Sequence, residues 1–145
     1  ITDRPLAVNL AEIRQVKREW PDRAMVVSLM VPCDEESWRS ILVQVEDTGA
    51  DAIELNFGCP HGMSERGMGA AVGQVPEYVE MVARWVKQHS KLPCIVKLTP
   101  NISDILEPAV AARASDERQQ RDGDDRRGEG FLAVSCSHGN HREPG

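Results

Sequence analysis

Three short apolar runs, separated by amphipathic stretches of helix length, constrain the fold of this chain more than any other feature. The runs span residues 25–31, 52–57 and 95–98. Strands alternating with helices form βαβ units and a parallel sheet, whose strands are buried on both faces and therefore nearly all apolar. The pattern leaves a (β/α)8 barrel or a doubly wound sheet, and three strands are too few to close a barrel.

Boundary residues mark where the intervening helices start and stop. Asp34 is expected to cap one helix and Gly49 to end it. A further helix is expected from Pro76 to about His89. Ser103 can cap a last helix, which Pro108 should kink or delay. With the helix near the N-terminus, the chain is predicted to hold about three strands and four helices.

Composition changes sharply after Ala114. Residues 1–114 read as an ordered domain, whereas residues 115–145 carry dense mixed charge and several glycines. We expect residues 115–130 to be disordered, because they have too few apolar groups to bury. A sequence rich in Arg, Gly and Asp is typical of out-of-frame translation of GC-rich DNA. The composition of the tail therefore suggests a frameshift. The sequence begins with Ile1 rather than Met, so we expect it to be a segment of a longer protein.

Charge and cysteine content exclude several classes of protein. The net charge of −6 argues against nucleic-acid binding. No apolar run approaches the ~20 residues of a membrane helix, and no secretory leader opens the chain, which favours a cytoplasmic protein. The four cysteines show no C-x-x-C spacing, so neither a disulfide framework nor a metal cassette is indicated. Cys136, His138 and His141 lack a fourth ligand, so no metal is predicted.

Polar residues inside the predicted strands are candidates for function. Alternation places Glu54 and Asn56 on the face opposite Ile53, and it places Lys97 within the third strand. A lysine there is costly unless it meets an anion or a polar ligand. It could instead pair with Glu54 and simply hold the interior together. We favour function, because Asn56, Lys97, Thr99 and Asn101 gather at the carboxyl ends of strands.

A cysteine and a long glycine-rich loop follow the second strand. Cys59 could be a nucleophile, a proton donor or an inert packing residue. The loop of residues 58–74 has the length and glycine content of a lid that closes over a site. It does not match a phosphate-binding loop, and His61 has no orienting acid in view.

Two sequence stretches resemble those of a known family. Residues 54–69 read ELNFGCPHGMSERGMG and residues 96–101 read VKLTPN. They resemble dihydropyrimidine dehydrogenases, in particular the FMN-bearing catalytic subunit of the bacterial NAD-dependent type, and the resemblance covers about residues 1–114. Dihydroorotate dehydrogenases share a similar turn, but they typically place Asn after the Cys-Pro pair, where this chain has His61.

The resemblance implies a partial (β/α)8 barrel of the TIM type that binds FMN at its mouth. The implied reaction reduces the 5,6 double bond of uracil or thymine, with hydride from N5 of FMN and a proton from Cys59. Asn56 would bind the pyrimidine, Lys97 would contact the flavin, and Thr99 and Asn101 would be weaker contacts. NADH, FAD and iron–sulfur clusters are expected only in the full system, where a partner subunit carries FAD and iron–sulfur clusters.

Two alternatives remain beside this interpretation. The chain could be a dihydroorotate dehydrogenase-like FMN enzyme. It could also be a truncated, non-catalytic product that associates with other chains through open sheet edges, because the family continues after residue 114 with further strands and an Asn-Thr pair that binds the pyrimidine.

Overall fold

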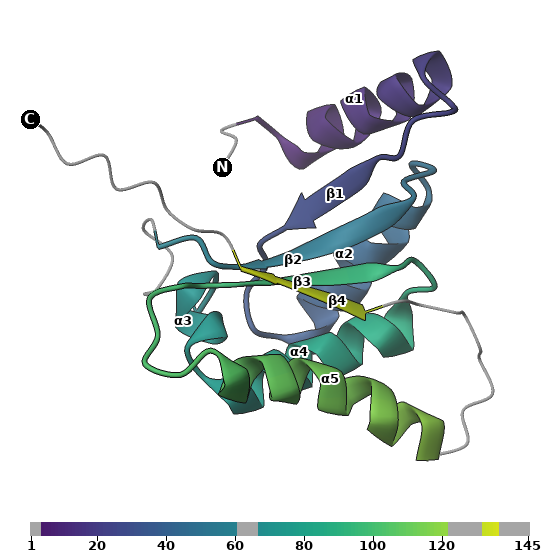
Figure 1. Cartoon of the computed structure of the whole chain (residues 1–145). Helices are drawn as coiled ribbons and strands as arrows, with labels where there is room; N and C mark the ends of the chain where they lie inside the picture. The colour runs from purple at the N-terminus through teal and green to yellow at the C-terminus, as the bar shows by residue number, and fades with distance from the viewer. Residues whose placement is uncertain (1–3, 61–66, 122–131, 137–145) are drawn as a thin grey trace, which may run out of the picture.

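The computed structural model describes residues 4–60, 67–121 and 132–136, which form alternating helices and strands (Figure 1). In chain order, the elements are α1 (Leu6–Glu19), β1 (Val26–Leu29), α2 (Glu35–Glu46), β2 (Ala52–Phe57), α3 (Ala70–Gly73), α4 (Pro76–His89), β3 (Cys94–Leu98), α5 (Leu106–Arg121) and β4 (Leu132–Cys136).

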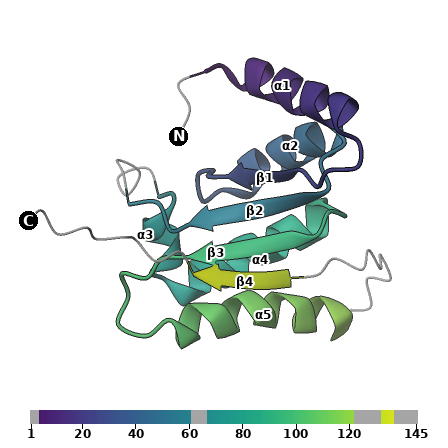
Figure 2. The ribbon, with the colours of Figure 1, turned by 45° about the horizontal axis from the view of Figure 1, so that its top comes forward.

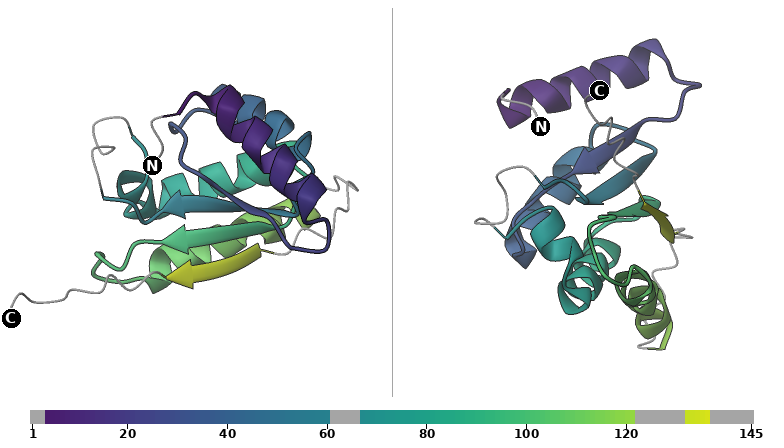
Figure 3. Two further views of the ribbon diagram at one scale, coloured as in Figure 1. Left: turned by 90° about the horizontal axis from the view of Figure 1, so that it is seen from above. Right: turned by 60° about the vertical axis from the view of Figure 1, so that its left-hand side comes forward.

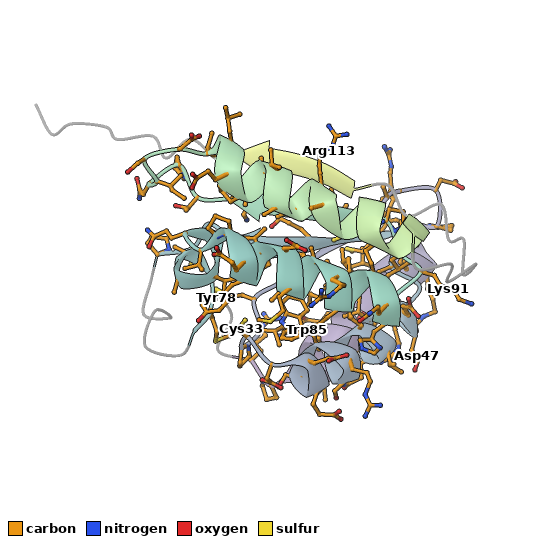
Figure 4. The ribbon with its side chains drawn as sticks, turned by 90° about the horizontal axis from the view of Figure 1, so that it is seen from below. Cys33, Asp47, Tyr78, Trp85, Lys91 and Arg113 are labelled. Carbon is orange, nitrogen blue, oxygen red and sulfur yellow. The ribbon has the colours of Figure 1, made fainter. Side chains whose placement is uncertain are left out.

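The four strands form one parallel sheet in the order β1-β2-β3-β4. Helices α2, α4 and α5 lie side by side on one face, with α4 in the middle (Figures 1 and 4). Helix α1 lies beyond the β1 edge (Figures 2 and 3). Because each parallel crossover brings the chain back to a neighbouring strand, this open sheet is consistent with part of a (β/α)8 barrel.

The hydrophobic core lies between the sheet and its helical layer. Ile53 and Leu55 on β2 are fully buried, and they share this core with Leu42 of α2 and Val79 of α4. Burying one such side chain contributes about 1.5–3 kcal/mol. The same alternation that sends these residues to the helices sends Glu54 and Asn56 to the other face of the sheet.

Several boundaries predicted from the sequence are confirmed. Asp34 caps α2 by accepting a hydrogen bond from the Ser37 N–H at 2.8 Å. Gly49 follows that helix with φ of +78°, a conformation that favours glycine. Helix α4 begins at Pro76 and ends at His89, as predicted.

Other expectations are corrected by the structure. Ser103 does not cap α5; instead, the carboxylate of Asp104 accepts the Leu106 N–H at 2.8 Å. Pro108 lies in the first turn of α5, where no intrahelical N–H is needed, so the helix is not interrupted. A short helix, α3, forms within the span expected to be loop.

The region after Ala114 also holds more structure than its composition suggests. Helix α5 continues past the predicted boundary at Ala114 to Arg121. Strand β4 (Leu132–Cys136) pairs with β3, so the described sheet has four strands rather than the three predicted. Residues 122–130 of the predicted tail lie outside the described residues.

The inner face of the sheet is the face opposite the helical layer, and it departs from the expectation that parallel strands are buried on both sides. Along β2 and β3, residues alternate between fully and partly buried. Ser28 on β1 is exposed. The difference arises because no described layer covers this face. Among the described residues, no helix combines the length and apolarity that a membrane span requires.

Candidate functional site

A polar network crosses the inner face of the sheet over three strands. The Glu54 carboxylate on β2 accepts a hydrogen bond from Lys97 Nζ on β3 at 2.7 Å and from Ser28 Oγ on β1 at 2.8 Å. Ser28 lies opposite Glu54 in register, and Lys97 lies opposite Asn56, two residues further along β2. The three side chains therefore meet because the strands are parallel and in this register.

Partial burial makes this network stronger than a surface ion pair. The Lys97 and Glu54 side chains retain 24% and 22% of their exposure. Charges held partly out of water attract each other more strongly than exposed charges do, although desolvation opposes part of that gain. The ion pair considered in the sequence analysis is thus present, and it also holds the Lys97 ammonium group on the open face.

Asn56 and Thr99 are fixed by local hydrogen bonds at the ends of their strands. The Asn56 side-chain oxygen accepts the Gly58 N–H at 3.2 Å, and Thr99 Oγ1 accepts the Asn101 N–H at 3.2 Å. Thr99 is 1% exposed, whereas Asn101 is exposed. The structure therefore places Asn56 beside Lys97, while Asn101 extends past the strand end into solvent.

Cys59 lies two residues past the end of β2 and is partly buried. Its carbonyl oxygen accepts the Ala70 N–H at 3.0 Å, which ties it to the start of α3. Gly69 has φ of +58°, and a Cβ atom there would lie 2.6 Å from the Cys59 carbonyl oxygen. The close contact between Gly69 and the Cys59 carbonyl group therefore requires glycine at position 69. This contact also holds the backbone of Cys59 in place.

A second glycine tightens the same junction. A Cβ atom at Gly73 would lie 2.3 Å from the Phe57 carbonyl oxygen, so α3 rests directly on the end of β2. This part of the glycine-rich segment serves as packing against the strand. The central part of the predicted lid, residues 61–66 with His61, lies outside the described residues, as do His138 and His141.

Ser28 is the member of the network that sequence reasoning missed. It is the one hydroxyl residue in the apolar run of residues 25–31, which is the signal that could have identified it. Its sequence position alone does not show that it meets Glu54, because the pairing of β1 with β2 decides that contact.

The donor set on this face suits a planar group that gains negative charge, such as a flavin on reduction. Lys97 supplies a partly buried ammonium group, and the amide of Asn56 lies opposite it in register. A cation at this place can stabilise negative charge on a reduced isoalloxazine ring. Within the described ranges, no group of three or more His, Cys, Asp or Glu side chains could hold a metal ion.

The parallel sheet, with polar residues at the carboxyl ends of its strands, has the arrangement of α/β enzymes. Comparison with known families identifies which family this chain belongs to. The family model for dihydroorotate dehydrogenase matches residues 5–120. The chain therefore belongs to the dihydroorotate dehydrogenase family.

Within that family, the chain is similar to dihydropyrimidine dehydrogenases. It is 47% identical over 109 residues to the chloroplastic NADP(+) enzyme of Arabidopsis thaliana, which covers 75% of this chain and 26% of the relative. It is 44% identical over 113 residues to the NAD-dependent dihydropyrimidine dehydrogenase subunit PreA of Escherichia coli K12, covering 78% of this chain and 27% of the relative.

The chain is also similar, at lower sequence identity, to dihydroorotate dehydrogenases. It is 37% identical over 91 residues to the catalytic subunit of dihydroorotate dehydrogenase B (NAD(+)) of Thermoplasma volcanium, covering 63% of this chain and 29% of the relative. The chain thus spans about a quarter of the length of the dihydropyrimidine dehydrogenases that it matches.

Proposed function

We propose that this chain carries part of an FMN-dependent active site that reduces the 5,6 double bond of uracil or thymine. The observation that carries the proposal is the grouping of Asn56, Lys97 and Cys59 at the carboxyl ends of β2 and β3. The similarity of 44–47% to dihydropyrimidine dehydrogenases supports the same reaction. FMN, when bound, supplies the hydride.

Each residue of the site has a role that follows from its chemistry. Cys59 donates the proton to C5 of the pyrimidine, because a thiol placed beside the ring can act as a general acid. Asn56 hydrogen-bonds the pyrimidine ring through its carboxamide. Lys97, held by Glu54, faces the flavin, and Thr99 and Asn101 contribute weaker contacts to the same cofactor.

The full reaction needs electrons that this chain does not itself supply. We propose that a partner subunit with FAD and iron–sulfur clusters delivers them from NADH in the cytoplasm. The name of the Escherichia coli relative, a subunit of an NAD-dependent enzyme, supports a division of the reaction between chains.

Turnover by a Cys59→Ser variant tests the proton-transfer step. With FMN bound and chemically reduced, reoxidation by uracil should slow by about 10²–10⁴-fold, because a serine hydroxyl is a much weaker acid. FMN affinity, measured by fluorescence, should change little. Cys33→Ser is the matched control, since Cys33 is another partly buried cysteine, and burial raises its pKa.

The possible results separate the hypotheses. Equal rates for Cys59→Ser and the unsubstituted chain would contradict the proton-donor role. A chain that retains no FMN would contradict activity of this polypeptide itself and favour the non-catalytic alternative.

The second candidate function is that of a dihydroorotate dehydrogenase. The family match over residues 5–120 and the similarity to the Thermoplasma volcanium subunit favour it. The pyrimidine that exchanges electrons with the flavin decides between the two: uracil or thymine supports the first function, and orotate supports the second.

A further inference from the structure

A serine on β1 belongs to the polar network, although the proposed reaction gives it no role. Ser28 Oγ donates a hydrogen bond to Glu54 Oε1 at 2.8 Å, and Lys97 Nζ donates to the same oxygen at 2.7 Å. Because β2 lies between β1 and β3, the two donors come from the two neighbouring strands. The Glu54 carboxylate is therefore held between them, and Ser28 is connected to Lys97 through it.

The strand register indicates which of the two donors fixes the carboxylate. Ser28 lies directly opposite Glu54, whereas Lys97 lies opposite Asn56, two residues further along β2. Serine has one side-chain dihedral angle between its backbone and its hydroxyl oxygen, so little rotamer freedom is lost when it donates. Glutamate and lysine are long, and each loses much more freedom when they pair. Ser28 thus forms the fixed end of this series of contacts, and Lys97 forms the flexible end.

The Lys97 ammonium group keeps donors for a ligand while it is held. An ammonium group has three N–H donors. Within the described ranges, Lys97 Nζ has one hydrogen-bond acceptor, which is Glu54 Oε1. Two N–H donors therefore remain for the flavin contact that the proposed function assigns to Lys97. The position of the Glu54 carboxylate decides where these donors point.

The place of Lys97 along its strand matters because Asn56 lies opposite it in register. The Asn56 carboxamide is itself fixed by a hydrogen bond from the Gly58 N–H at 3.2 Å. A cofactor contact and a substrate contact on neighbouring strands must keep a constant separation, since the rate of a reaction between two bound molecules depends steeply on their relative position. A device that fixes Lys97 relative to Asn56 is therefore useful to the proposed site.

We infer that Ser28 is a positioning residue, which fixes the Lys97 ammonium group through the Glu54 carboxylate. Ser28 acts on a ligand only through these two side chains. The inference rests on the proposed function for the identity of the ligand that Lys97 meets. The tether from β1 to β3 is a property of the chain without a ligand, and it can be measured without one.

Reactivity of the Lys97 amine in the cofactor-free chain tests the tether directly. The chain has four lysines, so acetylation by a small active ester can be followed at each of them by peptide mass spectrometry. Lys17 is the internal reference, because it is also paired with a carboxylate, that of Asp51 at 2.8 Å. In Ser28→Ala, Lys97 should be acetylated about 2–10 times faster relative to Lys17, because the Glu54 carboxylate is then free to turn away from the ammonium group.

Two further variants separate positioning from a general loss of stability. Ser28→Thr should restore the slow rate, since it keeps the hydroxyl group, suits a strand, and has room for its methyl group at this exposed position. Ser90→Ala is the matched control, because Ser90 Oγ donates to Glu46 Oε1 at 2.7 Å in another part of the chain. It should leave the acetylation of Lys97 unchanged. Circular dichroism and urea unfolding establish that each variant is folded under the reaction conditions.

A second measurement connects the tether to the flavin. In chain loaded with FMN, the reduction potential of the bound flavin should be lower in Ser28→Ala than in the unsubstituted chain. The reason is that a mobile ammonium group stabilises the negative charge of the reduced flavin less well. Reduced FMN should accordingly lose about 2–10-fold in affinity, and oxidised FMN should lose less. Ser28→Thr should restore both values, and Ser90→Ala should change neither.

The outcomes distinguish a failure of this inference from a failure of the proposed function. Unchanged acetylation of Lys97 in Ser28→Ala, or an equal increase in Ser90→Ala, would overturn the inference whatever the chain binds. Faster acetylation that Ser28→Thr reverses supports the tether, even in a chain that retains no FMN, a result that counts against the proposed function alone. Faster acetylation with an unchanged flavin potential would overturn the extension of the inference to the cofactor.

Discussion

The two faces of the sheet are built from alternate residues of the same strands, yet they have opposite characters. On the helical side, Ile53, Leu55 and Val96 are fully buried in an apolar core. On the inner side, Glu54 and Lys97 keep roughly a quarter of their side-chain exposure and pair with each other. The comparison shows that one face supplies stability, whereas the other can hold charged groups because it remains partly open to water.

Truncating a core side chain should give the largest effect on stability. Leu55→Ala leaves a cavity in a fully buried site and should lower the free energy of unfolding by about 2–5 kcal/mol. Ile95→Ala, on the partly buried inner face, should cost about 1 kcal/mol. Urea unfolding measures both values. Similar losses for the two variants would contradict the division of the sheet into a structural face and an open face.

Substitution at the junction below Cys59 should have the next largest effect. Gly69→Ala places a Cβ atom 2.6 Å from the Cys59 carbonyl oxygen. Gly67→Ala is a matched control, because Gly67 has a similar φ of +61° but nothing within 4 Å of its Cβ position. Gly69→Ala should lower the free energy of unfolding by about 1–3 kcal/mol more than Gly67→Ala does. Equal losses would mean that backbone strain alone matters at these positions.

Breaking the inner-face ion pair should have a smaller effect. Glu54→Gln leaves the Lys97 ammonium group without its carboxylate, and partial exposure limits the loss to about 1 kcal/mol. The double variant Glu54→Gln/Lys97→Met should lose less stability than the two single variants added together. Glu36→Gln, which breaks the exposed Arg39–Glu36 pair, should change little. Additive losses at Glu54 and Lys97 would show that the two groups are not coupled.

The smallest effect is expected from Asp51, which ties α1 and the segment before β1 to the start of β2. Hydrogen bonds from Lys17 and from the Met25 N–H lower the pKa of Asp51. A lowered folded-state pKa means that this contribution is present above the unfolded value of about 3.9 and is lost as the pH falls through the folded value. Asp51→Asn should therefore lose less stability as the pH falls, and unfolding midpoints measured between about pH 5 and pH 2 test this. An unchanged acid limb would contradict the assignment.

The sequence predicted the elements whose signals are local. Apolar alternation identified β2, and proline and aspartate positions identified the ends of α2 and α4. Composition was a poorer guide after Ala114, because a polar helix such as α5 is stabilised by packing on α4 rather than by its own apolar content. Residues 132–136 form a strand because they pair in parallel with β3, a contact between segments far apart in the chain.

The sequence also suggested most of the residues of the candidate site and the Lys97–Glu54 pair, but not the other contacts. Asn56, Lys97 and Cys59 could be chosen because polar residues in apolar strands and a cysteine at a strand end are unusual. Ser28 could not be assigned, and the Gly69–Cys59 contact could not be foreseen. Both depend on which segments lie side by side in space.

The sequence by itself therefore determined the local periods, the helix ends and the types of side chain available for chemistry. Only the tertiary structure decided the register that joins Ser28, Glu54 and Lys97, and the open face on which they lie. The physical reason is range: dihedral preferences and side-chain alternation act over a few residues, whereas strand pairing and burial depend on segments far apart in the chain.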